Sequence, residues 1–198
     1  VEADCTGHGV PGSMLSMMGI SSMKDIINSM ELLGNELQPS VILNRMRKVV
    51  KTLLAQNAND EFSVSDGMDM TIGIIDPETR LMKFASANQT AIIVRNGATI
   101  KIKGDRMPIG NYTIEEDFQD FDIQLQKGDA LYFMSDGIKD QTNPEREKYK
   151  SRRLEAFLIE NDSLPMNEIG KRLKSTIEAW RAGSEQVDDM TMVGVRIQ

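Results

Sequence analysis

Three short aspartate-bearing turns, far apart along the chain, constrain this sequence more than any other feature. Asp4 stands in the first turn, Asp136 in the second, and the pair Asp188-Asp189 in the third. Each turn contains glycine or threonine and adjoins a short apolar run that is typical of a β-strand. Acidic side chains at strand ends, brought together only by folding, are the oxygen ligands that a hard divalent cation requires. The sequence therefore favours a metal site that performs hydrolytic chemistry on phosphate.

Composition excludes several classes of protein. The chain has 198 residues and a net charge of -7, with 40% hydrophobic and 27% charged residues, which is ordinary for a globular domain. Nonspecific nucleic-acid binding requires a basic surface, so the acidic balance argues against that role. The single cysteine, Cys5, excludes an internal disulfide and suits a reducing cytoplasm. No apolar run approaches the roughly 20 residues of a membrane helix.

The chain begins at Val1 rather than at methionine, immediately before the first turn. Such a start is typical of a piece cut from a longer polypeptide. We therefore expect a cytoplasmic domain, with any sensor domain or membrane anchor of the full-length protein lying upstream.

Hydrophobic periodicity predicts an alternation of helices and hairpins. Helices are predicted over residues 13–30, 40–56 with Ser40 as N-cap, 145–159 and 165–180. Strands are predicted over residues 69–75, 80–87, 90–95, 99–103, 123–125, 130–134 and 190–197. Asn96-Gly97 and Lys127-Gly128-Asp129 each predict a hairpin turn. We expect one α+β domain over residues 1–198, an antiparallel β-sandwich or sheet covered by helices.

Five segments of the chain resemble the PPM-type, metal-dependent serine/threonine phosphatases. The resemblance is to the bacterial branch that includes stage II sporulation protein E and the stress-response phosphatases. These segments, in the order that the family has them, are Ala3–Gly12, Ser65–Asp69, Met107–Gly110, Leu131–Gly137 and Asp188–Thr191. Any one of them alone is a weak signal, since Ser-Asp-Gly is common in turns, but five in order form a specific signal.

The resemblance implies a β-sandwich flanked by helices with two Mn²⁺ or Mg²⁺ ions at one edge. Asp4 would bridge both ions, and Cys5 would contribute only its backbone carbonyl. Asp136 and Asp188 would complete the shell of the first ion. The family has a further acidic ligand on an upstream strand, so we expect a domain that lacks its first strand or strands. Sheet edges exposed in this way invite pairing between chains, and a homodimer is one expectation.

By the same resemblance, the substrate is a phosphoserine or phosphothreonine on a STAS-type antagonist of an anti-sigma factor. The region upstream of the domain would be a sensor. The alternative is a catalytically degenerate domain that acts as a signalling protein-binding or dimerisation module, although all the visible acids are intact. The ATP-binding fold of histidine kinases also uses Asp-x-Gly-x-Gly turns, but it leaves the second and third turns unexplained.

Several further residues have two interpretations each. His8, the only histidine, is either a general acid or a residue that stabilises the first turn. Asp66 is either a turn residue or a metal ligand. Lys103 and Arg106 either recognise the substrate phosphate or belong to a solvated surface. Asp140, Asn143 and Pro144 are candidates for shaping a mobile flap over the site.

Overall fold

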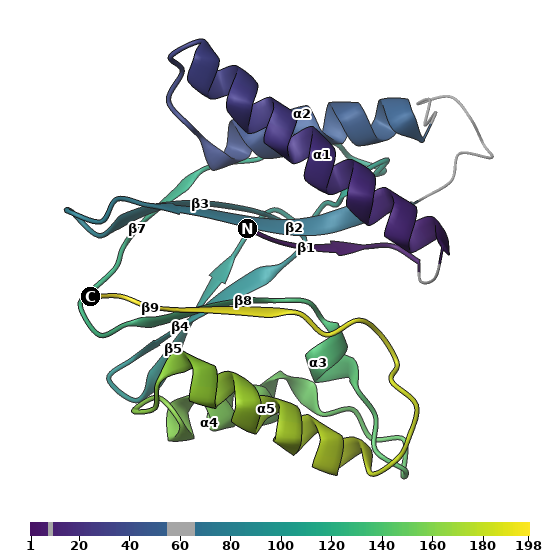
Figure 1. Ribbon diagram of the computed structural model, residues 1–198, viewed down its shortest axis with the longest axis vertical. Coiled ribbons are helices and arrows are strands. Elements are labelled where there is room, and N and C mark those ends of the chain that lie inside the picture. The colour runs from purple at the N-terminus through teal and green to yellow at the C-terminus, as the bar shows by residue number, and fades with distance from the viewer. Residues whose placement is uncertain (8–9, 55–65) are drawn as a thin grey trace. The chain divides into compact units, whose positions relative to one another are not determined.

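The computed structural model of the chain describes residues 1–7, 10–54 and 66–198. The chain divides into two compact units. The first consists of Val1 with residues 3–89 and 103–124, and the second of Glu2 with residues 90–102 and 125–198. Each unit has a sheet with helices packed on one of its faces (Figure 1). The predicted mixture of helices and antiparallel sheets is confirmed, and the expectation of a single domain stays a prediction.

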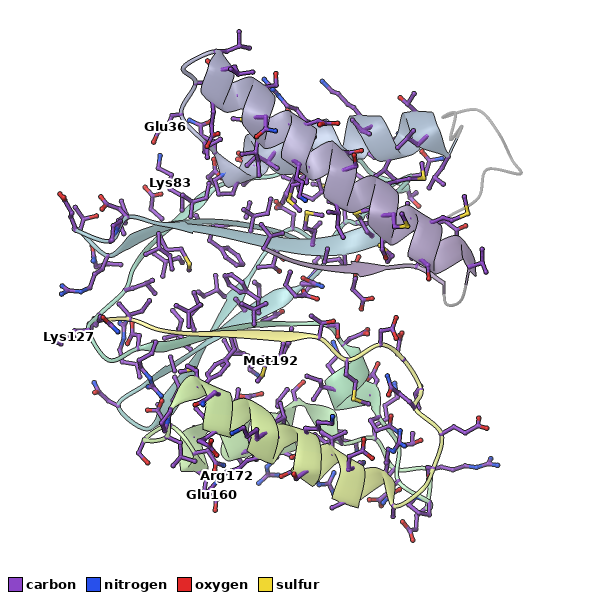
Figure 2. The ribbon with its side chains drawn as sticks, viewed as in Figure 1. Glu36, Lys83, Lys127, Glu160, Arg172 and Met192 are labelled. Carbon is purple, nitrogen blue, oxygen red and sulfur yellow. The ribbon has the colours of Figure 1, made fainter. Side chains whose placement is uncertain are left out.

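The sheet of the first unit has the strand order β1-β2-β3-β7, with β6 paired to β2. These strands are β1 (Glu2–Cys5), β2 (Gly67–Ile75), β3 (Leu81–Ala87), β6 (Ile109–Gly110) and β7 (Phe121–Gln124). Helices α1 (Val10–Leu32) and α2 (Pro39–Leu53) cover one face of the sheet (Figure 1). Lys83 of β3 points toward Glu36, between the two helices, and forms an ion pair with it at 3.0 Å (Figure 2).

The sheet of the second unit has the strand order β5-β4-β8-β9. Its strands are β4 (Thr90–Arg95), β5 (Ala98–Lys103), β8 (Ala130–Met134) and β9 (Met192–Arg196). Its helices are α3 (Gly137–Asp140), α4 (Lys150–Glu160) and α5 (Met166–Arg181), of which α4 and α5 lie over one face of the sheet (Figure 1). The short helix α3 directly follows β8, so Asp136 stands at a strand-to-helix junction.

Each unit has its own apolar core, because the apolar side of its helices packs against the sheet of the same unit. In α2, buried residues at helical spacing, including Leu43, Met46 and Val50, pack with Met68 and Met70 of β2. In α5, Ile169, Leu173 and Ile177 recur every four residues and pack in the core of the second unit. Met192 of β9 points toward α5 and packs against the same cluster (Figure 2).

Helix α1 is long but only partly apolar. Leu15, Ile26 and Met30 are buried in the core of the first unit, whereas Met14 and Met17 on the same helix are exposed. Over the described residues, no helix combines the length and the hydropathy needed to cross a lipid bilayer.

The Asn96-Gly97 hairpin is confirmed. Asn96 and Gly97 have φ values of 51° and 74°, and they connect β4 to β5, which are neighbours in the sheet. Positive φ at both central residues is the geometry of a type I′ turn, whose twist matches that of the flanking strands. Asparagine and glycine adopt this conformation more readily than other residues, which is why the sequence signal was reliable.

The predicted hairpin around Lys127-Gly128-Asp129 is wrong. Strand β7 pairs with β3 in the sheet of the first unit, whereas β8 pairs with β4 and β9 in the second. The turn bonds instead to the end of the chain. The N–H of Gly128 donates to the carbonyl of Ile197 at 2.8 Å, and the N–H of Ile197 donates to the carbonyl of Asp129 at 2.9 Å.

Two predicted helix starts are also wrong. The helix expected from residue 145 begins at Lys150, because Thr142 and Lys148 form an antiparallel bridge that keeps the preceding segment extended. Ser40 is not an N-cap, because α2 begins at Pro39, a residue favoured in the first helical turn. The N–H and hydroxyl of Ser40 donate instead to the carboxylate of Asp120, at 2.8 and 2.7 Å.

A buried ion pair holds β4 to the turn before β8. The guanidinium of Arg95 donates to the two carboxylate oxygens of Asp129 at 2.8 and 2.6 Å, and the Asp129 side chain is 1% exposed. Burial alone would raise the pKa of Asp129. Hydrogen bonds from Arg95 and from the N–H of Gln126 outweigh burial, so the pKa lies below its ordinary value.

Asp129→Asn is expected to lower the free energy of unfolding by about 3 kcal/mol, because it removes the buried charge of the pair and leaves the partly buried guanidinium of Arg95 without its anion. Since the folded-state pKa is depressed, the contribution of the pair is fully present above the unfolded pKa of about 4 and is lost as the pH falls through the folded value. Urea denaturation should therefore show a gap between wild type and variant at neutral pH that shrinks in acid. Glu168→Gln, which breaks an exposed pair with Lys171, is the control and should change stability little. Equal effects of the two substitutions would contradict the prediction.

Candidate functional site

Thr6 joins the Asp4 turn to the Asp66-Gly67 segment in the first unit. The N–H of Thr6 donates to the carbonyl of Gly67 at 2.9 Å. The Thr6 hydroxyl donates to the same carbonyl at 3.0 Å and accepts the N–H of Gly67 at 2.7 Å. The carboxylate of Asp66 lies 3.5 Å from that hydroxyl. The first two of the five family-like segments are therefore adjacent. Asp4, two residues before Thr6, is half-buried.

Cys5, next to Asp4, is a half-buried free thiol. The Ser16 hydroxyl, on α1, lies 3.3 Å from the Cys5 sulfur and donates to it. Burial raises the pKa of the Cys5 thiol, and the charge of Asp4 raises it further, against the lowering effect of the Ser16 hydrogen bond. The side chain is thus a protonated thiol at neutral pH. The expectation that Cys5 offers a metal only its backbone carbonyl stays a prediction.

Glycines allow α1 to begin very close to the first turn. A Cβ on Gly12 would lie 2.4 Å from the carbonyl oxygen of Gly7, so no larger residue fits at position 12. Gly7 has a φ of +83°, which side chains disfavour. His8 and Gly9 lie outside the described residues, so the two interpretations of His8 stay predictions.

The third segment, Met107–Gly110, adjoins the second. Gly67 stands opposite Gly110 and Met68 opposite Ile109 in the antiparallel pair of β2 and β6. A Cβ on Gly67 would lie 2.6 Å from the carbonyl oxygen of Ile109. The first unit therefore brings together three of the five segments through backbone contacts.

A buried arginine on α2 fixes the chain around this third segment. Arg47 donates to the carbonyl of Glu116 at 2.7 Å and to the sulfur of Met107 at 3.3 Å. Its guanidinium lies 4.0 Å from the centre of the Phe118 ring, a cation–π contact. Sequence reasoning did not single out Arg47, because its partners are about 60 residues away along the chain.

The second unit brings the remaining two segments together at Ser135. The Ser135 hydroxyl donates to the carbonyl of Asp189 and accepts the N–H of Thr191, both at 2.9 Å. The N–H of Ser135 donates to the carbonyl of Thr191 at 3.1 Å. Asp136 and Asp188 each stand one residue from this set of bonds, and both are exposed to solvent.

Gly137 makes the approach of these segments possible. A Cβ at position 137 would lie 2.3 Å from the carbonyl oxygen of Asp189 and 3.3 Å from the carbonyl carbon of Asp188. The glycine of the Ser-Asp-Gly segment therefore determines how closely the Asp188 loop can lie against α3. Within that loop, the N–H of Asp189 donates to the Asp188 carboxylate at 2.8 Å.

The donor chemistry of these residues fits a hard divalent cation. Asp4, Asp136 and Asp188 offer carboxylate oxygens, and the Cys5 carbonyl offers a neutral one, which are the ligands of Mg²⁺ and Mn²⁺ rather than of zinc. In the segments that the structure describes, no three acidic, histidine or cysteine side chains gather into one metal-binding cluster. Each unit thus presents its own part of the predicted ligand set.

The remaining candidate residues have local partners or lie at the surface. Asp140 pairs with Lys148 at 3.2 Å, and Asn143 accepts the N–H of Glu147 at 2.8 Å. Lys103 and Arg106 are exposed, and their two interpretations stay predictions.

The fold is that of PP2C-type protein phosphatase domains. The chain matches the SiaA-PP2C domain of Pseudomonas aeruginosa with a TM-score of 0.84 and 24% sequence identity, covering 99% of this chain and 74% of that one. It also matches a structure of the PP2C phosphatase domain, with a fragment of the regulatory domain, of SpoIIE from Bacillus subtilis. There the TM-score is 0.72 at 26% identity, covering 98% of this chain and 53% of that one.

The sequence matches the same class. The family model of stage II sporulation protein E (SpoIIE) matches residues 1–198, so the chain belongs to that family. Stage II sporulation protein E of Bacillus subtilis (strain 168) is 27% identical over 206 aligned positions, which cover 96% of this chain and 24% of the relative. The chain spans about a quarter of the length of the curated relatives that it matches. The predicted resemblance to the bacterial branch of the PPM-type phosphatases is confirmed.

Gly137→Ala is expected to lower Mn²⁺-dependent phosphatase activity about 100-fold, because the added methyl displaces the Asp188 loop by roughly 1 Å. Gly170→Ala is the matched control. A Cβ at position 170 of α5 meets no atom within 4 Å, so that variant should keep its activity and gain helix stability. Rates on p-nitrophenyl phosphate and thermal unfolding of both variants measure these effects. Full activity of Gly137→Ala would show that the close approach is dispensable.

Thr6→Val is expected to destabilise the protein by about 1–3 kcal/mol, because it removes the hydroxyl that accepts the Gly67 N–H while keeping the side-chain shape. Thr6→Ser keeps that hydroxyl and should cost much less. Chemical denaturation of the two variants measures the difference. Equal stability of the two would mean that the hydroxyl does not join the segments.

Proposed function

We propose that this domain is a metal-dependent phosphatase that hydrolyses phosphoserine or phosphothreonine on a regulatory protein. The observation that carries the proposal is the contact of Gly137 with the Asp188-Asp189 backbone. Because of this contact, the exposed residues Asp136 and Asp188 lie on segments that touch each other, although the two residues are about 50 positions apart in the sequence. Membership of the SpoIIE family supports the same function.

Two Mn²⁺ or Mg²⁺ ions are the proposed cofactors. Asp136 and Asp188 of the second unit and Asp4 of the first are the proposed carboxylate ligands, with the carbonyl of Cys5 as a neutral ligand. When bound, such ions supply a water of lowered pKa and positive charge for the phosphoryl oxygens. The thiol of Cys5 accepts a hydrogen bond from the Ser16 hydroxyl, and only the Cys5 carbonyl is proposed as a ligand.

The chain's own side chains favour direct attack by water over a covalent serine intermediate. Ser135, the serine beside Asp136, uses its hydroxyl both to donate to Asp189 and to accept from Thr191. It is also buried, at 3% exposure. A nucleophilic serine needs a free hydroxyl beside a general base, and Ser135 lacks the free hydroxyl. The role left to Asp136 and Asp188 is to hold the cations, which would lower the pKa of a bound water.

The proposed substrate is a STAS-type antagonist of an anti-sigma factor, dephosphorylated in the cytoplasm under the control of an upstream sensor. Family membership supports this choice. The Bacillus subtilis relative is described as a cell fate determinant with a regulatory domain besides its phosphatase domain.

The test is Mn²⁺-dependent phosphate release from p-nitrophenyl phosphate and from a phosphoserine peptide. Asp136→Asn and Asp188→Asn should each lower the rate by at least about 100-fold, since each removes charge from a metal ligand. Asp140→Asn is the matched control, because Asp140 lies in α3, the short helix that directly follows Asp136, but pairs with Lys148.

Asp189→Asn should cost less than Asp188→Asn if the first acid of the pair is the ligand. Hydrolysis that persists in Asp136→Asn and Asp188→Asn, or that proceeds at the same rate with a chelator, would contradict the proposed function.

A further inference from the structure

Gln141 is a buried amide that directly follows α3, the helix that begins after Asp136. Its side chain and backbone are completely buried, at 0% exposure. A buried amide needs hydrogen-bond partners for both its oxygen and its nitrogen, since each unsatisfied group costs desolvation energy. The identity of those partners shows what the residue holds in place.

The Gln141 amide binds the backbone of the segment that leads to Asp188. Its Nε2 donates to the carbonyl of Glu185 at 3.0 Å, and its Oε1 accepts the N–H of Val187 at 3.2 Å. One amide thus brackets Gln186 from both sides, as a neighbouring β-strand would do. Nε2 also donates to the carbonyl of Thr142 at 3.0 Å, which fixes the orientation of the amide.

The backbone of Gln141 is itself anchored to three helices. Its N–H donates to the carbonyl of Gly137 in α3 at 3.0 Å. Its carbonyl accepts the N–H of Tyr149, beside α4, at 2.9 Å and the indole N–H of Trp180 in α5 at 3.1 Å. The amide therefore projects from a rigid position.

The Asp188 loop is consequently held at both ends by side chains that flank Asp136. Gln141 holds Val187, on one side of Asp188, and Ser135 holds Asp189, on the other. Asp188 itself is the exposed residue between the two held positions.

We propose that Gln141 is a positioning residue that sets Asp188 relative to Asp136 and thereby the affinity of the site for Mn²⁺. The inference rests on the proposed function, in which these two aspartates bind metal. Glutamine suits the role because one side chain supplies a donor and an acceptor without a charge. Glutamate has no donor for Glu185, and asparagine is one methylene too short to reach both backbone groups.

Gln141→Met keeps the length of the side chain and removes its hydrogen bonds. We expect the Mn²⁺ dissociation constant, measured without substrate from the electron paramagnetic resonance signal of free Mn²⁺, to rise about 10–100-fold, as is typical when a residue that orients a ligand is lost. Asn161→Leu is the matched control. Asn161 is buried in the same unit, at 6% exposure, and bonds to Phe157 and Arg172, so its loss should reduce stability without changing Mn²⁺ affinity.

Two further readouts separate positioning from general damage. Trp180 is the only tryptophan, and its indole bonds to the Gln141 backbone, so its emission should stay unchanged in Gln141→Met. Saturating Mn²⁺ should restore most of kcat in that variant. Unchanged Mn²⁺ affinity in Gln141→Met, or an equal loss in Asn161→Leu, would overturn the inference.

A measurement on the unmodified protein covers the case in which Gln141→Met does not fold. Val187 is 56% exposed, yet its N–H should be protected from hydrogen exchange, because Oε1 of Gln141 accepts it. Exchange of Val187 at the rate of an unstructured amide would overturn the inference.

Retention of Mn²⁺ affinity in both Asp136→Asn and Asp188→Asn would instead overturn the proposed function, so the two failures are distinguishable.

Discussion

The contact between Gly137 and the carbonyl oxygen of Asp189 is the constraint on which the second unit's part of the site depends. Only a residue without a Cβ allows the Asp188 loop to lie this close to α3, because a Cβ would approach that oxygen to 2.3 Å. The two exposed aspartates next to this contact have their positions set by backbone packing. Their backbone positions are therefore set before any cation binds, which lowers the cost of assembling a metal site.

The first unit uses the same device twice. Gly12 approaches Gly7 where α1 begins, and Gly67 approaches Ile109 where β2 meets β6. In each case the glycine belongs to a segment that resembles the phosphatase family, and in each case its partner is a carbonyl oxygen of another such segment or of the same turn. The glycines of these segments allow two stretches of backbone to approach closely, while the acids offer metal ligands. This explains why glycines and acids occur together in these segments.

Local patterns predicted the features whose cause is local. Helical periodicity found α2 and α5, and Asn96-Gly97 fixed its hairpin because left-handed backbone suits those two residues. The Lys127-Gly128-Asp129 turn has similar chemistry, but its partner is Ile197, far away in sequence. Gln141 gave no signal for the same reason, since it bonds to Glu185, 44 residues away, and no spacing rule connects the two. Long-range hydrogen bonds to backbone groups leave no periodic trace in a sequence.

Neutral side chains hold the segments that carry the acids, and this has an electrostatic consequence. Thr6, Ser135 and Gln141 make their contacts through hydroxyl and amide groups. A lysine or arginine in the same positions would offset the negative charge that attracts a divalent cation. Two arginines of the second unit are instead paired elsewhere, Arg95 with Asp129 and Arg196 with Asp162. Positioning by uncharged groups thus adds no positive charge beside the carboxylates of Asp136 and Asp188, which favours metal binding at a site assembled from few acids.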